Sequence, residues 1–208
     1  GIPHLDSLVL RKAGKDFEQQ KAEAKYLLGF RPDKKMVVFA PPQLGRYEGS
    51  IDRALSQLAE WSIDTMTQMA MCFHPFEADE TFQSIQNAFQ THPYTKIVKP
   101  DMADTLDVIA LADVVISQHS TVAIETLALG IPFVEIDLDQ VGVLESLVEQ
   151  CLAKRVGPNE FKKIEAILEG NGMPNYVLVN EWLVNNVGPR DGQSSKRAAD
   201  EIESMVNA

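Results

Sequence analysis

Short apolar runs alternate along the chain with longer segments in which apolar residues recur at helical spacing. The apolar runs have the length of buried strands and span residues 35–40, 69–73, 96–98, 114–117 and 133–136. The helical segments span residues 15–28, 50–63, 78–90, 103–111 and 121–129. Short buried strands separated by helices are typical of a parallel sheet with helices on both faces. The pattern therefore predicts an α/β, Rossmann-like domain of three layers.

Beyond residue 140 the pattern becomes mainly helical. Helical spacing covers residues 141–150, 159–168, 176–186 and 194–206. The sequence has no internal repeat and no low-complexity segment. We therefore expect residues 1–208 to form one domain with a mainly helical C-terminal part over 141–208. A chain of this length can bury its own core.

The connections between the predicted strands indicate where a ligand would bind. Right-handed crossovers place the C-terminal ends of parallel strands on one edge of the sheet. The loops on that edge follow Ala40, Phe73, Val98, Ser117 and Ile136. Ligands of open α/β sheets bind at this edge.

Composition and charge narrow the range of partners. Of the 208 residues 45% are apolar and 24% charged, the net charge is −11, and no basic run exceeds two residues. Such a surface repels nucleic acid, although backbone N–H groups in a cleft can still bind a small anion. Two cysteines without C-x-x-C spacing, together with the lack of a transmembrane-length apolar stretch or signal peptide, favour a cytoplasmic location. The first residue is not methionine, which fits either a piece of a longer chain or a processed one.

A cluster of small polar residues ends the apolar run 114–117. Ser117, His119, Ser120 and Thr121 lie between this strand and the next helix, where exposed N–H groups favour an anion. Glu125, about one helical turn further on, is placed to accept two hydrogen bonds from a ribose diol. The same residue types also serve as ordinary helix caps, and both interpretations stay open at this point. The sequence contains neither G-x-G-x-x-G nor GxxxxGK[ST].

Residues 113–134, "DVVISQHSTVAIETLALGIPFV", carry a resemblance to a known group of proteins. They resemble the donor-nucleotide motif in the C-terminal domains of GT-B-fold glycosyltransferases. The resemblance is to the group that contains UDP-N-acetylglucosamine 2-epimerases, CDP-glycerol glycerophosphotransferases and capsule-polysaccharide transferases. It implies that Glu125 holds the nucleotide ribose and that Ser120 and Thr121 form the phosphate loop.

Other stretches resemble the same group in the same order. These stretches are "GIPHLD", "KAEAKYLLGFRPDKKMVVFAPP", "FHPFE" and "DGQSSKRAADEI". A GT-B enzyme has two Rossmann-like domains, so the resemblance implies that this chain is the C-terminal half. The N-terminal domain, which binds the acceptor, is then absent from the sequence.

The resemblance adds site residues on the other loops of the ligand edge. It implies that His74 donates to a donor phosphate and that the loop ending at Thr105 borders the base. His119 lies inside the phosphate loop, in reach of the same anion, at a position where the group often carries serine. Arg46 has a guanidinium suited to a diphosphate. Each also has a plain structural interpretation, as a turn histidine, a loop residue, a helix cap or a solvated arginine. His4 is interpreted as a surface residue.

Two classes of function follow from the sequence. The first is transfer of a sugar or phospho-polyol from a UDP- or CDP-type donor to an acceptor in cell-surface polysaccharide synthesis. The general base would come from the missing domain, so we expect the isolated chain to be inactive. The alternatives are a 2-epimerase-like enzyme and a non-catalytic nucleotide-binding module. Gly45 stands where the epimerases carry a functional histidine, which argues against epimerisation. We expect no cofactor and no metal.

Overall fold

The fold is described from a computed structural model of the chain. The structure describes residues 3–41, 50–74, 76–118, 120–137, 145–157, 159–171 and 173–206. Arg46 and His119 lie outside these residues, and so do residues 141–144 of the predicted helix 141–150.

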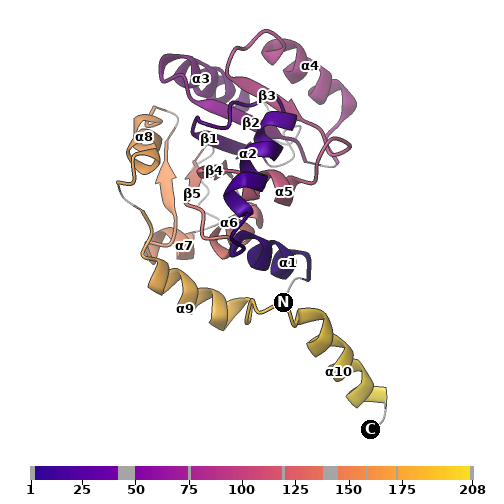
Figure 1. The fold of residues 1–208 in the computed structure, drawn as a ribbon. Helices are drawn as coiled ribbons and strands as arrows, with labels where there is room; N and C mark the ends of the chain where they lie inside the picture. The colour runs from indigo at the N-terminus through magenta and orange to yellow at the C-terminus, as the bar shows by residue number, and fades with distance from the viewer. Residues whose placement is uncertain are drawn as a thin grey trace.

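The apolar runs form a parallel sheet, as the sequence predicts (Figure 1). Its strands are β1 Met36–Ala40, β2 Gln68–Cys72, β3 Thr95–Val98, β4 Val114–Ser117, β5 Phe133–Ile136 and β6 Lys154–Val156. The strands lie in the order β3-β2-β1-β4-β5-β6, and every neighbouring pair is parallel. The sequence pattern does not predict β6. This strand has three residues, two of them basic, and it lies at a sheet edge where charged side chains are common.

Helices precede the first strand, connect the strands and follow the last one. They are α1 Pro3–Lys12, α2 Phe17–Leu27, α3 Ser50–Asp64, α4 Asp79–Phe89, α5 Thr105–Ala110, α6 Val122–Ala128, α7 Glu145–Glu149, α8 Lys162–Leu168, α9 Tyr176–Asn186 and α10 Ser194–Val206. Nine of these match predicted helical segments. The tenth, α1, was not predicted. It buries Leu5 and Leu8 on one face and places Asp6 in its first turn, where a carboxylate interacts favourably with the helix dipole.

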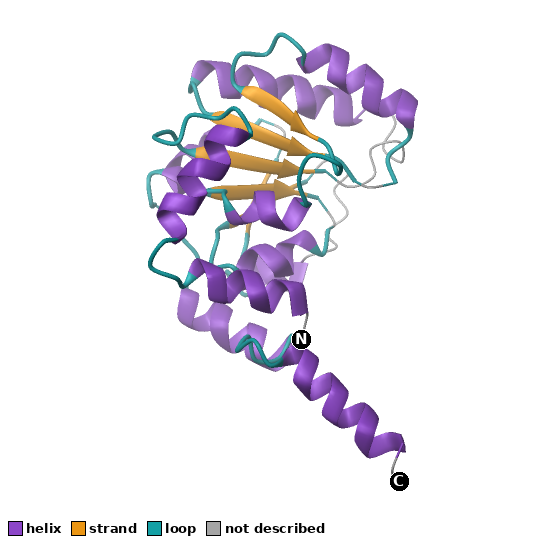
Figure 2. Ribbon diagram, turned by 45° about the vertical axis from the view of Figure 1, so that its right-hand side comes forward, coloured by secondary structure: helices purple, strands orange, loops and turns teal. Residues whose placement is uncertain are grey.

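The helices cover both faces of the sheet (Figure 2). Because successive strand residues point to opposite faces, Val38 belongs to a core cluster with residues of α1, α5, α6 and α9, whereas Val37 and Phe39 belong to a second cluster with residues of α3, α4 and α8. All five residues of β1 are buried, as expected for a central strand of a parallel sheet. The two packed faces confirm the predicted three-layer arrangement.

The C-terminal helix α10 extends away from the packed layers (Figures 1 and 2). Its first residue, Ser194, donates from its N–H and its hydroxyl to the buried carboxylate of Asp6 in α1. Arg197 forms an ion pair with Asp191 at 2.8 Å. These contacts hold the start of α10 against the domain. Among the described helices, none has the length and apolarity needed to cross a membrane.

The central strands β1 and β4 are joined by side chains at both ends. At the N-terminal end, the Met36 N–H donates to Asp113 Oδ2 at 2.8 Å, and the Asp113 N–H donates to the Met36 carbonyl at 2.8 Å. At the C-terminal end, Ser117 is paired in register with Ala40 and its hydroxyl donates to the Ala40 carbonyl. This strand pair positions the loops at the ligand edge.

Candidate functional site

The strand order reverses between β1 and β4. From β1 the chain adds β2 and β3 on one side, then crosses to add β4, β5 and β6 on the other. Open α/β sheets bind ligands outside the carboxyl ends of the strands at such a reversal. The last residues of β1 and β4, Ala40 and Ser117, flank this point, and the end of β2 lies one strand away. The candidate site is therefore built on the C-terminal end of β4 and its neighbours.

Ser117 is the last residue of β4 and is fully buried. Its hydroxyl already donates to the Ala40 carbonyl, so this side chain joins two strands within the sheet. The sequence predicts a ligand-binding role for Ser117. In the structure its side chain positions the loop that follows β4.

Ser120 and Thr121 lie at the start of α6, as predicted. The Ser120 hydroxyl accepts from the Val122 N–H at 3.2 Å, and the Ser120 carbonyl accepts from the Ala123 N–H at 3.1 Å. Thr121 is exposed, and its side chain makes no capping hydrogen bond. Within the described parts of the chain, no acceptor bonds the N–H of Ser120 or Thr121. Two backbone donors at the end of β4 are thus open to an anion.

Glu125 lies one turn into α6 and is half-buried. Burial raises the pKa of this carboxyl group, the negative charge of Asp104 raises it further, and His4 lowers it. No described residue donates a hydrogen bond to its carboxylate. A half-buried carboxylate without a donor is stabilised by any ligand that supplies O–H or N–H groups.

The loop after β3 approaches Glu125 from one side. Asp104 caps α5 by accepting from the Leu106 N–H at 2.8 Å, and Thr105 is the half-buried first residue of that helix. The loop therefore ends in a helix cap formed by Asp104, and a contact between the loop ending at Thr105 and a base stays a prediction. The carboxylate of Asp104 adds negative charge beside Glu125, so this part of the site does not favour a ligand anion.

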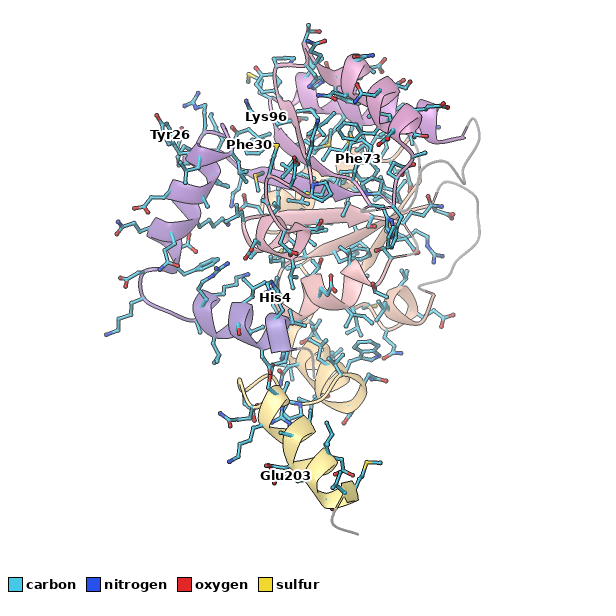
Figure 3. All side chains as sticks on the ribbon, turned by 90° about the vertical axis from the view of Figure 1, so that its right-hand side faces the viewer. His4, Tyr26, Phe30, Phe73, Lys96 and Glu203 are labelled. Carbon is cyan, nitrogen blue, oxygen red and sulfur yellow. The ribbon has the colours of Figure 1, made fainter. Side chains whose placement is uncertain are left out.

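His4 reaches the same region from α1, whose N-terminal end is marked by His4 in Figure 3. His4 Nε2 lies 3.9 Å from Asp104 Oδ1, and both side chains are largely exposed. The side chain is thus at the surface, as expected, but it has an acidic neighbour that the sequence did not indicate. The two residues are a hundred positions apart, and only the packing of α1 against α5 brings them together.

Asp107 completes a cluster in which His4, Asp104 and Asp107 have ligand atoms within 4.8 Å of one another. Such a group can approach a divalent cation. However, Asp107 is already paired with Arg11 at 2.7 Å, and Asp104 is engaged as the α5 cap. We assign no metal to these residues.

His74 follows β2, next to Phe73, which Figure 3 labels. The ring is half-buried, and its Nδ1 accepts from the Phe76 N–H at 3.2 Å. A neutral imidazole that accepts at Nδ1 carries its proton on Nε2. His74 therefore presents an N–H donor from the ligand edge. Since β1 separates β2 from β4, the two loops are about 10 Å apart, the span of two strand spacings.

Comparison with known proteins adds the fold relationship. No protein-family model and no curated protein sequence matches the chain. Among solved structures, the wall teichoic acid polymerase TagF soaked with CDP-glycerol covers 100% of this chain with 50% of its own length, at 16% identity and a TM-score of 0.66. The UDP-GlcNAc 2-epimerase from Neisseria meningitidis, bound to UDP-GlcNAc, covers 98% of this chain with 53% of its own, at 16% identity and a TM-score of 0.58.

A second epimerase shows the same relationship. The UDP-GlcNAc 2-epimerase from Methanocaldococcus jannaschii, in complex with UDP-GlcNAc and UDP, covers 88% of this chain with 52% of its own, at 13% identity and a TM-score of 0.56. The chain thus spans about half the length of the solved structures that it matches. Both kinds of relative are enzymes, and the match confirms the predicted resemblance at the level of the fold. The chain has the α/β architecture, with a six-stranded parallel sheet, of one half of the GT-B-fold proteins.

Proposed function

We propose that this chain is the donor-binding half of an enzyme that transfers a sugar or phospho-polyol from a nucleotide-diphosphate donor of the UDP or CDP type. The acceptor would belong to cell-surface polysaccharide synthesis, and the reaction would take place in the cytoplasm. The observation that carries the proposal is Glu125, a half-buried carboxylate with a raised pKa at the reversal of strand order. The Glu125 carboxylate can accept a hydrogen bond from each of the two hydroxyl groups of a ribose.

The polar groups around the site suggest how a donor would lie. The ribose would bond to Glu125, and the diphosphate would extend along the strand ends, away from Asp104. The Ser120 and Thr121 N–H groups and the Nε2–H of His74 are donors on that path. We also assign Arg46 to the diphosphate for its guanidinium chemistry and His119 for its place in the sequence beside Ser120, and we assign the loop ending at Thr105 to the base, as the resemblance implies.

Such donors would act on the leaving group. When the donor bond breaks, negative charge grows on the diphosphate oxygens, and fixed N–H groups stabilise it more in the transition state than in the bound donor. Of the described carboxylates at the site, Glu125 is assigned to the ribose, Asp104 caps α5, and Glu135, the register partner of Ser117, is buried and paired with Arg155. We therefore propose that the acceptor base lies in the other half of the GT-B fold.

A 2-epimerase-like activity is the second candidate, because two of the solved structures with this fold are 2-epimerases that bind UDP-GlcNAc. Transfer is preferred because the TagF match covers the whole chain at a higher TM-score. Calorimetric titration with UDP-GlcNAc and CDP-glycerol separates the candidates by the donor that binds more tightly.

The ribose contact is tested by Glu125→Ala and Glu125→Gln. Loss of a charge-assisted hydrogen-bond acceptor should weaken nucleotide binding by about 1–3 kcal/mol, or roughly 5- to 150-fold. Glu23→Gln makes the same chemical change on the exposed surface of α2 and should leave affinity unchanged. Equal affinity of Glu125→Gln and the parent chain would remove Glu125 from the site. Donor hydrolysis by the isolated chain would contradict the assignment of the base to the missing half.

A further inference from the structure

A cavity of about 380 Å³ lies between α1, the end of α6 and the start of α9. Because α6 begins after β4 and runs back to the start of β5, its C-terminal end, which lines this cavity, faces the opposite edge of the sheet from Ser117 and His74. Its walls are apolar at Val9, Leu127 and Val179. Its polar side chains include Lys12 and Arg190. No carboxylate is among the described residues that line it.

The two cations bond to consecutive carbonyl groups. Lys12 Nζ donates to the Leu129 carbonyl at 2.5 Å, and Arg190 Nη1 donates to the Ala128 carbonyl at 2.7 Å. Arg190 Nη2 also donates to Asn180 Oδ1. Two positive charges are thus both held at the C-terminal end of α6, in a chain whose net charge is −11.

Part of their role is to cap α6. Gly130, with a φ of +65°, donates its N–H to the Leu127 carbonyl, and the Ile131 N–H donates to the Thr126 carbonyl. The Ala128 and Leu129 carbonyls are the two that remain, and the cations satisfy them. This capping uses only some of the available donors, because an ammonium group has three N–H bonds and a guanidinium five.

The positions of the cations carry an electrostatic cost. Burial lowers the pKa of Lys12 to about 8, with Lys21 adding to the effect and Glu18 and Asp113 opposing it. Burial also lowers the pKa of Arg190, against the attraction of Asp6. The positive end of the α9 dipole is also close, because Tyr176, the first residue of that helix, lines the cavity. An anion in the cavity would offset all three.

We propose that this cavity binds the phosphoryl group of a small phosphorylated ligand. Adjacent guanidinium and ammonium groups suit a tetrahedral oxyanion. The volume exceeds that of a phosphate ion and falls in the range of small-molecule sites. A short organic body would lie against Val9, Val179 and the ring of Tyr176. This site is separate from the donor site and does not depend on the function proposed above.

The test uses inorganic phosphate as the first ligand, titrated into the chain by calorimetry. Asn180→Asp is the decisive variant, because it keeps the acceptor for Arg190 and adds a negative charge at the cavity wall. We expect it to weaken phosphate binding about tenfold, through like-charge repulsion, without lowering Tm. Arg190→Met should weaken binding at least as much. The control, Arg197→Met, removes a cation from the same C-terminal segment outside the cavity and should leave affinity unchanged.

Further ligands decide the chemistry and the location. Glycerol phosphate should bind more tightly than inorganic phosphate if the apolar wall contacts an organic body, whereas a nucleoside monophosphate should gain nothing. Glu125→Gln should leave phosphate binding intact. The proposal is overturned if Asn180→Asp binds phosphate as the parent does, if Glu125→Gln abolishes the binding, or if the parent shows no binding heat. Because Asn180→Asp keeps the α6 cap, it still tests the proposal if Arg190→Met misfolds.

Discussion

Replacing Asp113 with asparagine should destabilise the whole domain. Asp113 accepts from the Met36 N–H and lies 3.5 Å from Lys21 Nζ, 3.6 Å from Lys25 Nζ and 3.7 Å from Lys35 Nζ. Burial alone would raise the pKa of this carboxyl group, but the Met36 N–H and the three lysines outweigh burial and lower it. The ionised form is therefore the one that stabilises the start of the β1–β4 pair.

The size of the effect follows from Lys25. Its side chain is 3% exposed, and its other described partner is the Lys34 carbonyl at 2.9 Å. Removing one partner of a buried ion pair costs about 3–5 kcal/mol. Asp113 is 19% exposed, and asparagine still offers an oxygen to the Met36 N–H, so about 3 kcal/mol is expected for Asp113→Asn. For a domain of this size, that corresponds to a decrease in Tm of about 6–12 °C.

Urea unfolding of both proteins at neutral pH measures the difference directly. Lys35→Met is the matched control: Lys35 is 65% exposed, so losing its pair with Asp113 should cost less than about 1 kcal/mol. The parent's advantage over Asp113→Asn should also disappear as the pH falls through the lowered pKa of Asp113, since the carboxylate is then protonated in the native state. A difference below about 0.5 kcal/mol at neutral pH, the level of an ordinary surface change, would refute this account of the lysine cluster.

Three further outcomes are expected. The pKa of Lys12 is lowered from 10.5 to about 8, so between these pH values the unfolded chain binds a proton that the native chain has lost. The free energy of unfolding should therefore rise with pH across that interval. Urea unfolding of Lys12→Met should lack this rise. Ser117→Ala should lower the free energy of unfolding in urea by about 1 kcal/mol, because the hydrogen bond to the Ala40 carbonyl is lost. Nucleotide affinity should not change, and a large loss of affinity would mean that the hydroxyl contacts the ligand. The pKa of Glu125 is raised in the free chain, and a ribose diol favours the ionised form of this carboxyl group. Nucleotide-sugar affinity should therefore increase as the pH rises through that pKa, and calorimetry should detect proton release on binding. An unchanged affinity across the acidic range would count against the contact.

Local patterns in the sequence were sufficient for most of the secondary structure. The bounds of β4 and β5 agree with the prediction at every residue, because a buried strand is an unbroken apolar run that ends in polar residues. The strand β6 was not predicted, because Lys154 and Arg155 interrupt any apolar run there. Its extended conformation depends on pairing with β5. The first helix, α1, was also not predicted, because its apolar face is evident only from the packing of Leu5 and Leu8 in the core.

The sequence by itself determined the alternation of strands and helices, the edge where the polar loops gather, and the position of Glu125 one turn into the helix that follows β4. These depend on residues that are close in the chain, so periodicity and spacing suffice to find them. Only the tertiary structure decided the strand order, the role of Ser117 within the sheet, and the placement of Asp104 and His4 beside Glu125. It also decided that Lys12 and Arg190 share one cavity. Such contacts join residues about twenty to nearly two hundred positions apart, and they arise from packing across the sheet, which no local pattern encodes.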